Sequence, residues 1–475
     1  MRHRWLPSWS FMLPGFRLSC CGPRGCGNTR ERIFISAETI PGAGEAVAES
    51  EPADITTRGG FRDILAVPAF RRLWLAQMAA QLGEAVALVA LPLLAFAMTG
   101  SAELLSFIFV LQLIPRIILA PITGVIADRL DRKRLMIVCD LARMVLVGIM
   151  PFTQEAWQVG FLAVLIAIGN AFARPAELAA VPMVAPPHLL VPALSATQVA
   201  GSVVRVIGPA LAGAIVTLAG PGPAFGAQAV CFALSAAILF GLTLPATAPA
   251  PETSTISALD AVREEMRDGL RIVWSNPIVR GTAAVEALWQ LVFSSLFVAA
   301  LVYVEESLHL GDEAASAFSL LTACFAGGTA IGALAARPVE RRIGRPVLMA
   351  IGYLAPLTLI PAAFTPPLPV LFACWLALGF TDAWAVIAMQ SYLAESVEDA
   401  LRGRMYATWT AVVTIGGAIA LIVVGRLTET IGPPLTLAIA GATVGIGGPI
   451  LLWLTGALPA MLKQRREAVE VAAPG

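Results

Sequence analysis

Long apolar runs separated by short polar stretches are the main feature of this sequence. A helix needs about 20 mostly apolar residues to cross the hydrocarbon core of a bilayer. Runs of this kind cover Leu73–Met98, Leu104–Ala127, Leu135–Phe152, Val159–Val181, Ala193–Ala219, Ala224–Leu244, Gly281–Val304, Ala315–Ala336, Val347–Phe364, Val370–Ala394, Met405–Gly425 and Leu435–Leu458. The pattern predicts an all-α membrane protein with twelve transmembrane helices.

Basic residues gather in alternate connections between these runs. One side holds Arg129, Arg132, Lys133, Arg134, Arg263, Arg267, Arg271, Arg280, Arg337, Arg341, Arg342, Arg345, Arg402, Arg404, Lys463, Arg465 and Arg466. The opposite connections contain Arg426 as their one Lys or Arg. Positively charged loops stay in the cytoplasm. We therefore expect a multi-pass protein of a bacterial inner membrane with both termini in the cytoplasm.

A polar stretch between the sixth and seventh runs divides the spans into two sets of six. We expect bundles at residues 66–245 and 281–458, a cytoplasmic linker at 246–280 and a cytoplasmic tail at 459–475. Residues 1–65 are either a disordered leader or a segment upstream of the true start. The linker is either a surface helix on lipid or a solvated helix, with one apolar face formed by Leu259, Val262, Met266, Leu270 and Val273.

The two halves resemble each other. Gly124 with its following basic loop recurs in degraded form at Gly332, and Gly213 and Gly220 recur at Gly425 and Gly432, in each case about 210 positions later. A duplicated six-helix unit is a common way to build a transporter, with the substrate site between the halves near the midplane of the bilayer.

The most specific motif is the loop that ends the second span, Gly124-Val-Ile-Ala-Asp128-Arg129-Leu-Asp131-Arg132-Lys133-Arg134. It resembles the loop signature of the major facilitator superfamily, except that Asp131 stands where many members have Gly. The resemblance implies a fold of two pseudo-symmetric six-helix bundles and a gating role for this loop. We expect Asp140 and Arg143, three positions apart on one helical face, either to form a structural pair or to join that gate.

The fifth span contains a second motif, Gly201-Ser-Val-Val-Arg205-Val-Ile-Gly208-Pro209-Ala-Leu-Ala-Gly213. It resembles the glycine-proline motif of exporters in this superfamily. Gly208 and Gly213 favour close helix packing, and Pro209 removes one backbone hydrogen bond. A gate or a proton barrier follows from the resemblance.

Further stretches are similar to the branch that includes enterobactin and macrolide exporters, the transmembrane secretion effectors. They are Trp74-Leu-Ala-Gln77 with Gly83-Glu84, Cys139-Asp140-Leu-Ala-Arg143, Arg174-Pro175-Ala176 and Arg402-Gly403-Arg404. One departure is the fourth span, where residues 160–173 lack the arginine of many drug/proton antiporters. An arginine-assisted proton step in that helix is therefore in doubt.

Charged residues inside spans are functional candidates, because each costs roughly 2.5–3.5 kcal/mol to insert. Glu84 and Arg116 lie near mid-depth of the first two spans, where we expect them to face each other across a central cavity. Glu84 is then either a proton or substrate carboxylate or half of a static ion pair. Glu286, at the start of the seventh span, and Asp382, in the tenth, are further candidates for substrate contact.

Composition excludes several classes of protein. The chain is 57% hydrophobic and 13% charged, whereas soluble domains carry about 25% charged residues. It has no Gly-x-x-x-x-Gly-Lys loop, and its three histidines fall outside the predicted spans. We expect that the protein is not an ATPase or any other enzyme, and that it binds no metal, cofactor or nucleic acid.

The resemblance implies a secondary transporter, acting as a monomer, that exports a small molecule such as a drug, a siderophore or a secondary metabolite. Export by proton antiport with alternating access is the first interpretation, and its partners are the substrate, protons and membrane lipids. The alternative is an importer or a facilitator of lipids such as lysophospholipids on the same fold.

Overall fold

The computed structural model describes residues 61–244, 267–310, 313–397 and 399–472, without the side chains of 120–122, 124–129, 205–206, 399–400, 402–403 and 465–472. The helices before the linker are α1 (Phe61–Ala66), α2 (Pro68–Thr99), α3 (Ala102–Arg129), α4 (Arg132–Ile149), η1 (Met150–Phe152), α5 (Ala156–Val184), η2 (Pro187–Leu189), α6 (Leu190–Ala219) and α7 (Pro221–Phe240). The helices after it are α9 (Pro277–Phe297), α10 (Ala299–Val302), η3 (Tyr303–Ser307), α11 (Ala314–Ile343), α12 (Arg345–Leu354), η5 (Ala355–Phe364), α13 (Leu368–Ser396), α14 (Asp399–Ile431), α15 (Pro433–Leu454) and α16 (Ala457–Ala472).

Twelve helical segments in this described part of the chain are long and apolar enough to cross a membrane. The predicted fold class and number of spans are therefore confirmed. Several helices extend past the apolar runs: α2 begins at Pro68 rather than Leu73, and α9 begins at Pro277 rather than Gly281. Polar residues at the ends of a span lie at the membrane surface, where hydropathy no longer marks the helix boundary.

Local sequence explains where several helices begin. The Asp131 side chain accepts a hydrogen bond from the Arg134 amide at 2.9 Å, which caps α4. The Asn276 side chain caps α9 in the same way, by accepting from the Ile278 amide at 2.9 Å. Such caps satisfy backbone N–H groups that have no partner within the helix. They fix the ends of the helices that carry the charged residues described below.

Two spans of the second half are irregular. The seventh changes from α9 to α10 at Val298 and ends in a π-helical turn. The ninth changes from α12 to the 3₁₀ helix η5, which contains Pro356 and Pro361. Proline has no amide N–H to donate to an α-helical hydrogen bond, and 3₁₀ runs longer than three or four residues are uncommon. The prolines account for the change of helix type in the ninth span.

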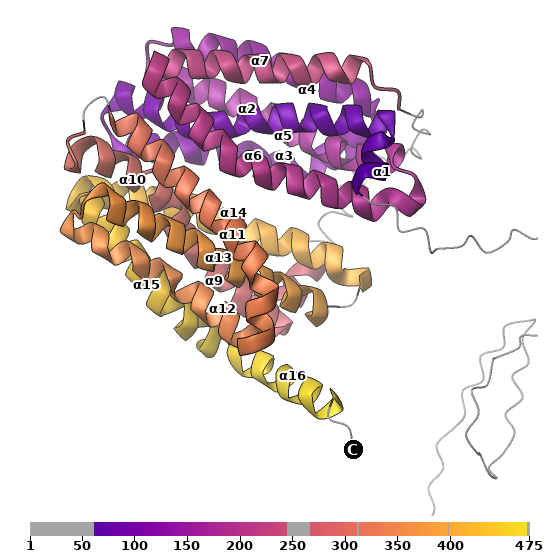
Figure 1. The fold of residues 1–475 in the computed structure, drawn as a ribbon, viewed down its shortest axis with the longest axis vertical. Coiled ribbons are helices and arrows are strands. Elements are labelled where there is room, and N and C mark those ends of the chain that lie inside the picture. The colour runs from indigo at the N-terminus through magenta and orange to yellow at the C-terminus, as the bar shows by residue number, and fades with distance from the viewer. Residues whose placement is uncertain (1–60, 245–266, 311–312, 398, 473–475) are drawn as a thin grey trace, which may run out of the picture. The chain divides into compact units, whose positions relative to one another are not determined.

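Helices of each half pack mainly with one another (Figure 1). In the first half α2 lies against α6 and α7, and α4 lies against α5 and α7. In the second half α11 lies against α13, and α9 lies against α14 and α15. The halves meet where α6 packs on α11 and where α3 packs on α14. Two helices of each half therefore form most of the contact between halves.

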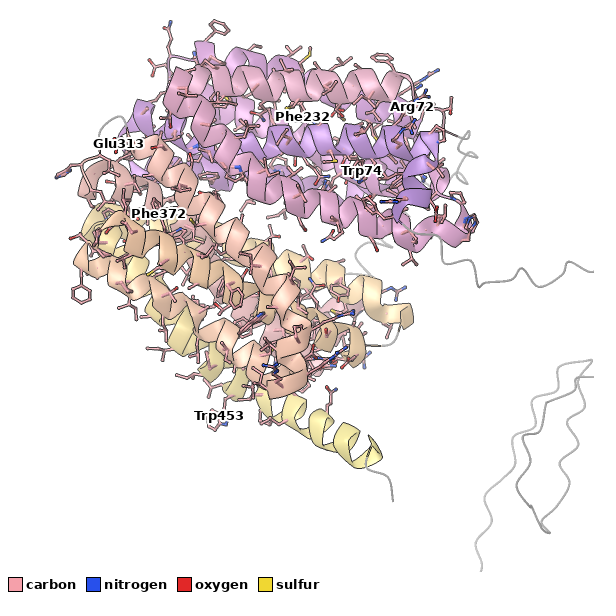
Figure 2. The ribbon with its side chains drawn as sticks, viewed as in Figure 1. Arg72, Trp74, Phe232, Glu313, Phe372 and Trp453 are labelled. Carbon is pink, nitrogen blue, oxygen red and sulfur yellow. The ribbon has the colours of Figure 1, made fainter. Side chains whose placement is uncertain are left out.

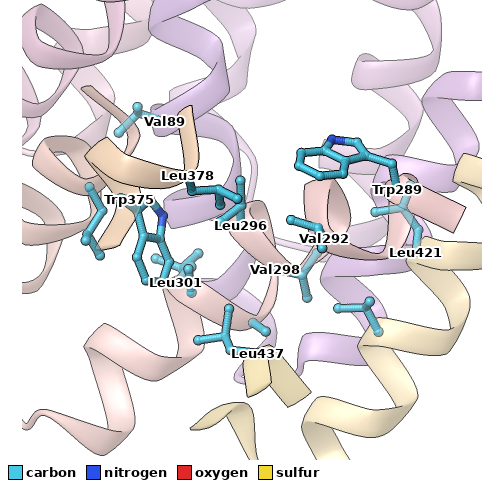
Figure 3. Packing of buried hydrophobic residues seen from close by; sticks show 14 of the residues in the cluster. Val89, Trp289, Val292, Leu296, Val298, Leu301, Trp375, Leu378, Leu421 and Leu437 are labelled. Atoms are coloured by element: carbon cyan, nitrogen blue, oxygen red, sulfur yellow. The ribbon is translucent and has the colours of Figure 1, made fainter. Parts of the chain in front are cut away.

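The largest hydrophobic cluster joins both halves. Figure 3 shows part of it, with Val89 of α2 near Trp375, Leu378 and Leu296 of the second half. Its members from the first half begin at Ala80 on α2 and include none from the start of that helix. The start of α2 belongs instead to a second cluster, around Phe70, that contains residues of the first half alone. The hydrophobic core of the first half is therefore continuous with the second half at one end only, the end of the α2–α3 and α6–α7 connections.

Large apolar side chains also cover the outer surface. Phe152, Leu218 and Leu334 are 80%, 86% and 83% exposed, and Trp453 projects outward from α15 (Figure 2). Soluble proteins avoid extensive exposed apolar patches. These side chains are instead placed to contact lipid.

The predicted linker lies partly outside the described residues, which exclude Leu259, Val262 and Met266. Its last part, residues 267–275, is helical. Asp268 there pairs with Arg404 of α14, with 2.9 Å between the charged atoms. The predicted domain boundaries and the choice between a surface helix and a solvated helix stay predictions.

Candidate functional site

A buried arginine organises the polar centre of the first half. Arg143 on α4 is 1% exposed, and its Nη1 lies 3.1 Å from the Glu84 carboxylate on α2. Its Nη2 donates to Asp140, one turn earlier on α4. The Glu84 side chain is 37% exposed, so this ion pair has one partly exposed end. Breaking a buried pair of this kind leaves an uncompensated charge, which is strongly destabilising.

Two further helices complete the surroundings of Arg143. Asn170 on α5 accepts from Arg143 Nη1 at 2.5 Å, and Ser235 on α7 donates to the second oxygen of Asp140 at 2.6 Å. The guanidinium also lies 4.5 Å from the ring centre of Phe232, labelled in Figure 2. Cation–π contacts favour arginine over an aromatic face. Four helices, α2, α4, α5 and α7, therefore hold one cation.

Glu177 on α5 adds a third carboxylate to this charge centre. It is 9% exposed, interacts electrostatically with Arg143, and pairs with Arg174 at 3.3 Å. The backbone carbonyl of Glu177 accepts from Gln77 Nε2 at 3.2 Å, which ties α5 to α2. We call the set of Gln77, Glu84, Asp140, Arg143, Asn170, Glu177 and Ser235 the Arg143 cluster.

The expected pairing of Glu84 with Arg116 is wrong. Arg116 lies on an exposed face of α3 and makes no ion pair with a described residue. Glu84 pairs with Arg143 instead. Depth along a helix can be read from hydropathy, but the direction in which a side chain points depends on how each helix is rotated in the bundle. The other expectation, a pair between Asp140 and Arg143, is confirmed.

The second half holds two carboxylates for which the described part of the chain shows no cationic partner. Glu286 lies nine positions after the start of α9, deeper than the sequence indicated, and is close enough to Asp382 on α13 for the two to interact electrostatically. Both carboxylates also interact electrostatically with the Tyr353 side chain of α12, which is 1% exposed. No hydrogen bond or salt bridge joins either carboxylate to another described residue. The pair thus contrasts with the first half, where Arg143 forms ion pairs with Glu84 and Asp140.

Matching glycine–serine contacts join the two halves. A Cβ atom at Gly213 of α6 would overlap the Ser319 side chain of α11, and one at Gly425 of α14 would overlap the Ser106 side chain of α3. Small residues let helix backbones approach closely. The predicted match of Gly213 with Gly425 therefore places equivalent residues at the two contacts between halves.

The predicted match of Gly220 with Gly432 has the same backbone geometry at both positions. Their φ angles are 84° and 85°, where glycine is the favoured residue. They connect α6 to α7 and α14 to α15, which are equivalent places in the two halves.

Polar contacts also cross between the halves at the end where the hydrophobic core is continuous. Arg426 of α14 pairs with Glu103 of α3 at 3.1 Å. The Ser101 hydroxyl donates to Glu429 at 2.6 Å, and the Glu103 amide donates to the same carboxylate at 3.3 Å. We call these four residues the clasp. Arg426 and Glu103 are 66% and 56% exposed, so water weakens their attraction.

The basic part of the loop motif ties three helices together. Arg132 Nη1 donates to the Ala179 carbonyl of α5 at 3.3 Å, and Lys133 Nζ donates to the Phe240 carbonyl of α7 at 2.8 Å. The side chains of Asp128 and Arg129 lie outside the described residues, although the backbone of Gly124, Asp128 and Arg129 belongs to α3. The gating role of this loop stays a prediction.

The glycine-proline motif lies between two packing partners. A Cβ atom at Gly208 would overlap the Cβ of Ala85, next to Glu84 on α2, whereas Gly213 faces the other half as described above. Gly201 and Pro209 are buried within α6, and the side chain of Arg205 lies outside the described set. The motif therefore connects the neighbourhood of Glu84 with the contact between halves.

Sequence reasoning did not identify the functional candidates Asn170, Glu177, Ser235 and Tyr353. Asn170, Ser235 and Tyr353 are neutral, so the presence of charge within a span does not identify them. Glu177 lies in the span but close to Arg174-Pro175-Ala176, where it reads as part of a motif at the end of the helix. Within the described residues no group of three or more His, Cys, Asp or Glu side chains is arranged to hold a metal ion.

Comparison with protein-family models gives a match over residues 63–472 to the family described as transmembrane secretion effector. Among curated proteins, the multidrug efflux pump Tap of Mycobacterium tuberculosis is 27% identical over 382 residues, which cover 77% of this chain and 88% of Tap. The macrolide efflux protein A of Streptococcus pyogenes is 31% identical over 148 residues, which cover 30% of this chain and 36% of that protein.

Solved structures share the fold. The nucleoside transporter NupG superposes with a TM-score of 0.61 at 14% identity, covering 82% of this chain and 98% of NupG. A POT family transporter superposes with a TM-score of 0.64 at 12% identity, covering 82% of this chain and 96% of that chain. At these identities the superpositions establish the architecture, and the substrates of those proteins carry no information about this one.

Proposed function

The chain belongs to the transmembrane secretion effector family of the major facilitator superfamily, and on that premise we propose that it exports a small molecule in exchange for protons by alternating access. It is a multi-pass membrane transporter and not an enzyme. The observation that carries the proton step is the Arg143 cluster, a partly exposed carboxylate paired with an arginine deep within the spans. Intramembrane ionisable residues of this kind commonly mark proton relays.

Export is supported by the relatives, which are named as efflux proteins for multiple drugs and for macrolides. These names favour export over the alternative of an importer or a lipid facilitator. The proposed substrates are accordingly drugs, siderophores or secondary metabolites of small size.

Alternating access is supported by the way the halves touch. Their hydrophobic core is continuous at the clasp end only, and the paired Gly213–Ser319 and Gly425–Ser106 contacts relate the two halves symmetrically. Rocking two such bundles against each other would open one end as the other closes. The loop motif begins at the end of α3 and the glycine-proline motif lies in α6, and these two helices form the main contacts with the second half.

Glu84 is the proposed entry point for protons. Its side chain is 37% exposed, so protons from water can reach it. Its partner Arg143 is held in place by Asp140, Asn170 and Phe232. A proton on Glu84 would weaken this ion pair, and its loss would restore it. Such a change in one pair is a local electrostatic event that can bias two states of a bundle.

Substrate contact is proposed for Glu286 and Asp382 in the second half. Neither carboxylate has a counterion among the described residues, and Trp289 lies one turn from Glu286 on the same helix. The orientation follows the positive-inside rule, which places both termini and the loop motif in the cytoplasm and the clasp on the opposite side. The proposed setting is a bacterial inner membrane, with lipids, protons and the substrate as partners of a monomer.

The test uses purified protein in liposomes with an imposed pH gradient. Radiolabelled erythromycin and fluorescent ethidium serve as probes, and accumulation is followed with and without a protonophore. The proposal expects uptake that needs the gradient and that Glu84→Gln abolishes, whereas the exposed Glu306→Gln retains it. Uptake of both probes that ignores the protonophore would rule out proton antiport.

Cells provide the test of direction. Cells of an efflux-deficient strain that express the protein should become less susceptible to hydrophobic antibiotics and should accumulate less ethidium than cells without it. Increased accumulation in the expressing cells would show import and would contradict the proposal.

A further inference from the structure

The Arg143 cluster contains more negative than positive buried charge. Glu84, Asp140 and Glu177 supply three carboxylates from α2, α4 and α5, while Arg143 is the buried cation. Arg174, which pairs with Glu177, has a side chain that is 56% exposed. A buried charge without compensation is costly. Adding one proton would bring the three carboxylates and two guanidinium groups to neutrality.

The three carboxylates are not equally compensated. Asp140 receives hydrogen bonds on both oxygens, from Arg143 and from Ser235. Glu84 receives one from Arg143 at 3.1 Å. Glu177 receives one at 3.3 Å from Arg174, the arginine that water screens. Of the three carboxylates, Glu177 therefore loses the least stabilising interaction when it is protonated.

A hydrogen-bond acceptor without a partner lies beside Glu177. Gln77 is 5% exposed, and its Nε2 donates to the Glu177 backbone carbonyl at 3.2 Å, which holds the amide group against this turn of α5. The Oε1 atom of the same amide has no hydrogen-bond partner. A carboxylic acid, unlike a carboxylate, has an O–H to donate. The unused Gln77 oxygen is a suitable acceptor for a protonated Glu177.

A second unpartnered atom belongs to the arginine itself. Arg143 is 1% exposed, yet its Nε has no hydrogen-bond partner. Buried polar atoms are normally satisfied, and exceptions in a native structure call for an explanation. The cluster thus has one unused donor and one unused acceptor among its most deeply buried groups, which is expected where the arrangement of protons changes during the working cycle.

We propose that Glu177 is the carboxylate that holds the coupling proton inside the first half, with Glu84 as the partly exposed group that exchanges it. In the protonated state an O–H bond is present on a Glu177 oxygen, and the cluster together with Arg174 has no net charge. On release that O–H bond breaks, the proton passes to the Glu84 carboxylate and from there to water, and the Glu177 carboxylate interacts again with Arg174 and Arg143. Its other charged or titratable neighbours are Glu84, Cys139 and Asp140, and Arg132 reaches the next turn of α5.

This assignment rests on the proposed proton antiport and deepens it. Glu177→Gln mimics the protonated side chain at nearly equal size, and Glu177→Asp keeps a titratable carboxyl. The control is Glu306→Gln, an exposed glutamate outside the cluster. Ethidium is the probe in three measurements. Protein reconstituted in liposomes gives the uptake driven by a pH gradient and the ethidium exchange at equal pH. Protein in detergent gives the proton release when ethidium binds.

Glu177→Gln should lose uptake driven by the gradient by roughly tenfold or more, within the usual range of coupling between two ligands. It should keep exchange within about twofold and release fewer protons on binding. Glu177→Asp should retain uptake with a shifted pH profile, which a merely structural side chain would not produce. If Glu177→Gln cannot be purified in a folded form, the shift of the pH profile of uptake in Glu177→Asp tests the assignment.

Two outcomes separate the assignment from its premise. Wild-type protein that takes up ethidium without regard to the pH gradient would overturn the antiport, and the assignment with it. If the wild-type protein needs the gradient and Glu177→Gln shows the same gradient-driven uptake and proton release as wild type, the assignment alone is overturned. An unshifted pH profile in Glu177→Asp would also overturn it.

Discussion

Arg143 and Glu84 form an ion pair at 3.1 Å although they are 59 positions apart in the chain. The pair links α4 to α2 at the centre of the first half. Its two ends differ, since the arginine is buried and the glutamate side chain is 37% exposed. This asymmetry lets one partner stay fixed while the other meets protons or substrate.

Arg143→Ala should destabilise the protein and abolish transport. Removing the arginine leaves Asp140 buried without its counterion, which costs about 3–5 kcal/mol. Arg116→Ala is the matched control, because Arg116 is exposed and makes no ion pair with a described residue. Thermal unfolding in detergent and ethidium efflux measure both effects. Equal loss of stability in the two variants would contradict the central role of Arg143.

Cross-linking the clasp should stop transport. The Ser101 hydroxyl and the Glu429 carboxylate are 2.6 Å apart across the two halves. In a protein whose seven cysteines are replaced, Ser101→Cys with Glu429→Cys would be joined by a short cleavable thiol reagent. Because alternating access requires this end to separate, efflux should fall on linking and return on cleavage. Ser101→Cys alone, treated in the same way, is the control.

By contrast, Arg426→Ala should have a small effect on the free energy of unfolding. The Arg426–Glu103 pair is mostly exposed, and exposed pairs contribute about 0.2–1 kcal/mol. A loss of stability as large as that of Arg143→Ala would show that the clasp is more than a surface contact.

Gly213→Ala should weaken transport, and Ser319→Gly should restore it. The new methyl group would overlap the Ser319 side chain where α6 meets α11, and overpacking of this kind costs about 1–3 kcal/mol. The pair Gly425→Ala and Ser106→Gly should behave in the same way at the other contact. Gly226→Ala is the control, because a Cβ there meets no atom within 4 Å. Efflux that is unchanged in Gly213→Ala would argue against close contact at this point.

Asp382→Asn should reduce transport of cations more than transport of neutral compounds. The Glu286–Asp382 pair has no counterion among the described residues, so a positively charged ligand would gain most from both charges. Susceptibility of expressing cells to ethidium and to chloramphenicol compares the two classes, with Glu306→Gln as the control. We expect a change of roughly tenfold for ethidium, the size of a 1.4 kcal/mol contact. Equal losses for both compounds would point to a structural role.

The sequence by itself determined the membrane architecture. Hydropathy and the placement of arginines predicted twelve spans in two sets of six, because lipid admits few polar side chains and every backbone amide must be paired within a helix. The repeats of Gly213 and Gly220 at Gly425 and Gly432 predicted the equivalence of the halves. These features depend on local composition and spacing, which the chain carries in its order of residues.

The tertiary structure alone decided which intramembrane charges meet. Arg116 and Arg143 are both arginines within spans, yet only the rotation of α3 and α4 about their axes exposes the first and buries the second beside Glu84. The same packing brings Glu177 into the Arg143 cluster and leaves Glu286 and Asp382 without a cationic partner among the described residues. Helix rotation results from the sum of many weak side-chain contacts along each helix, and no single stretch of sequence specifies it.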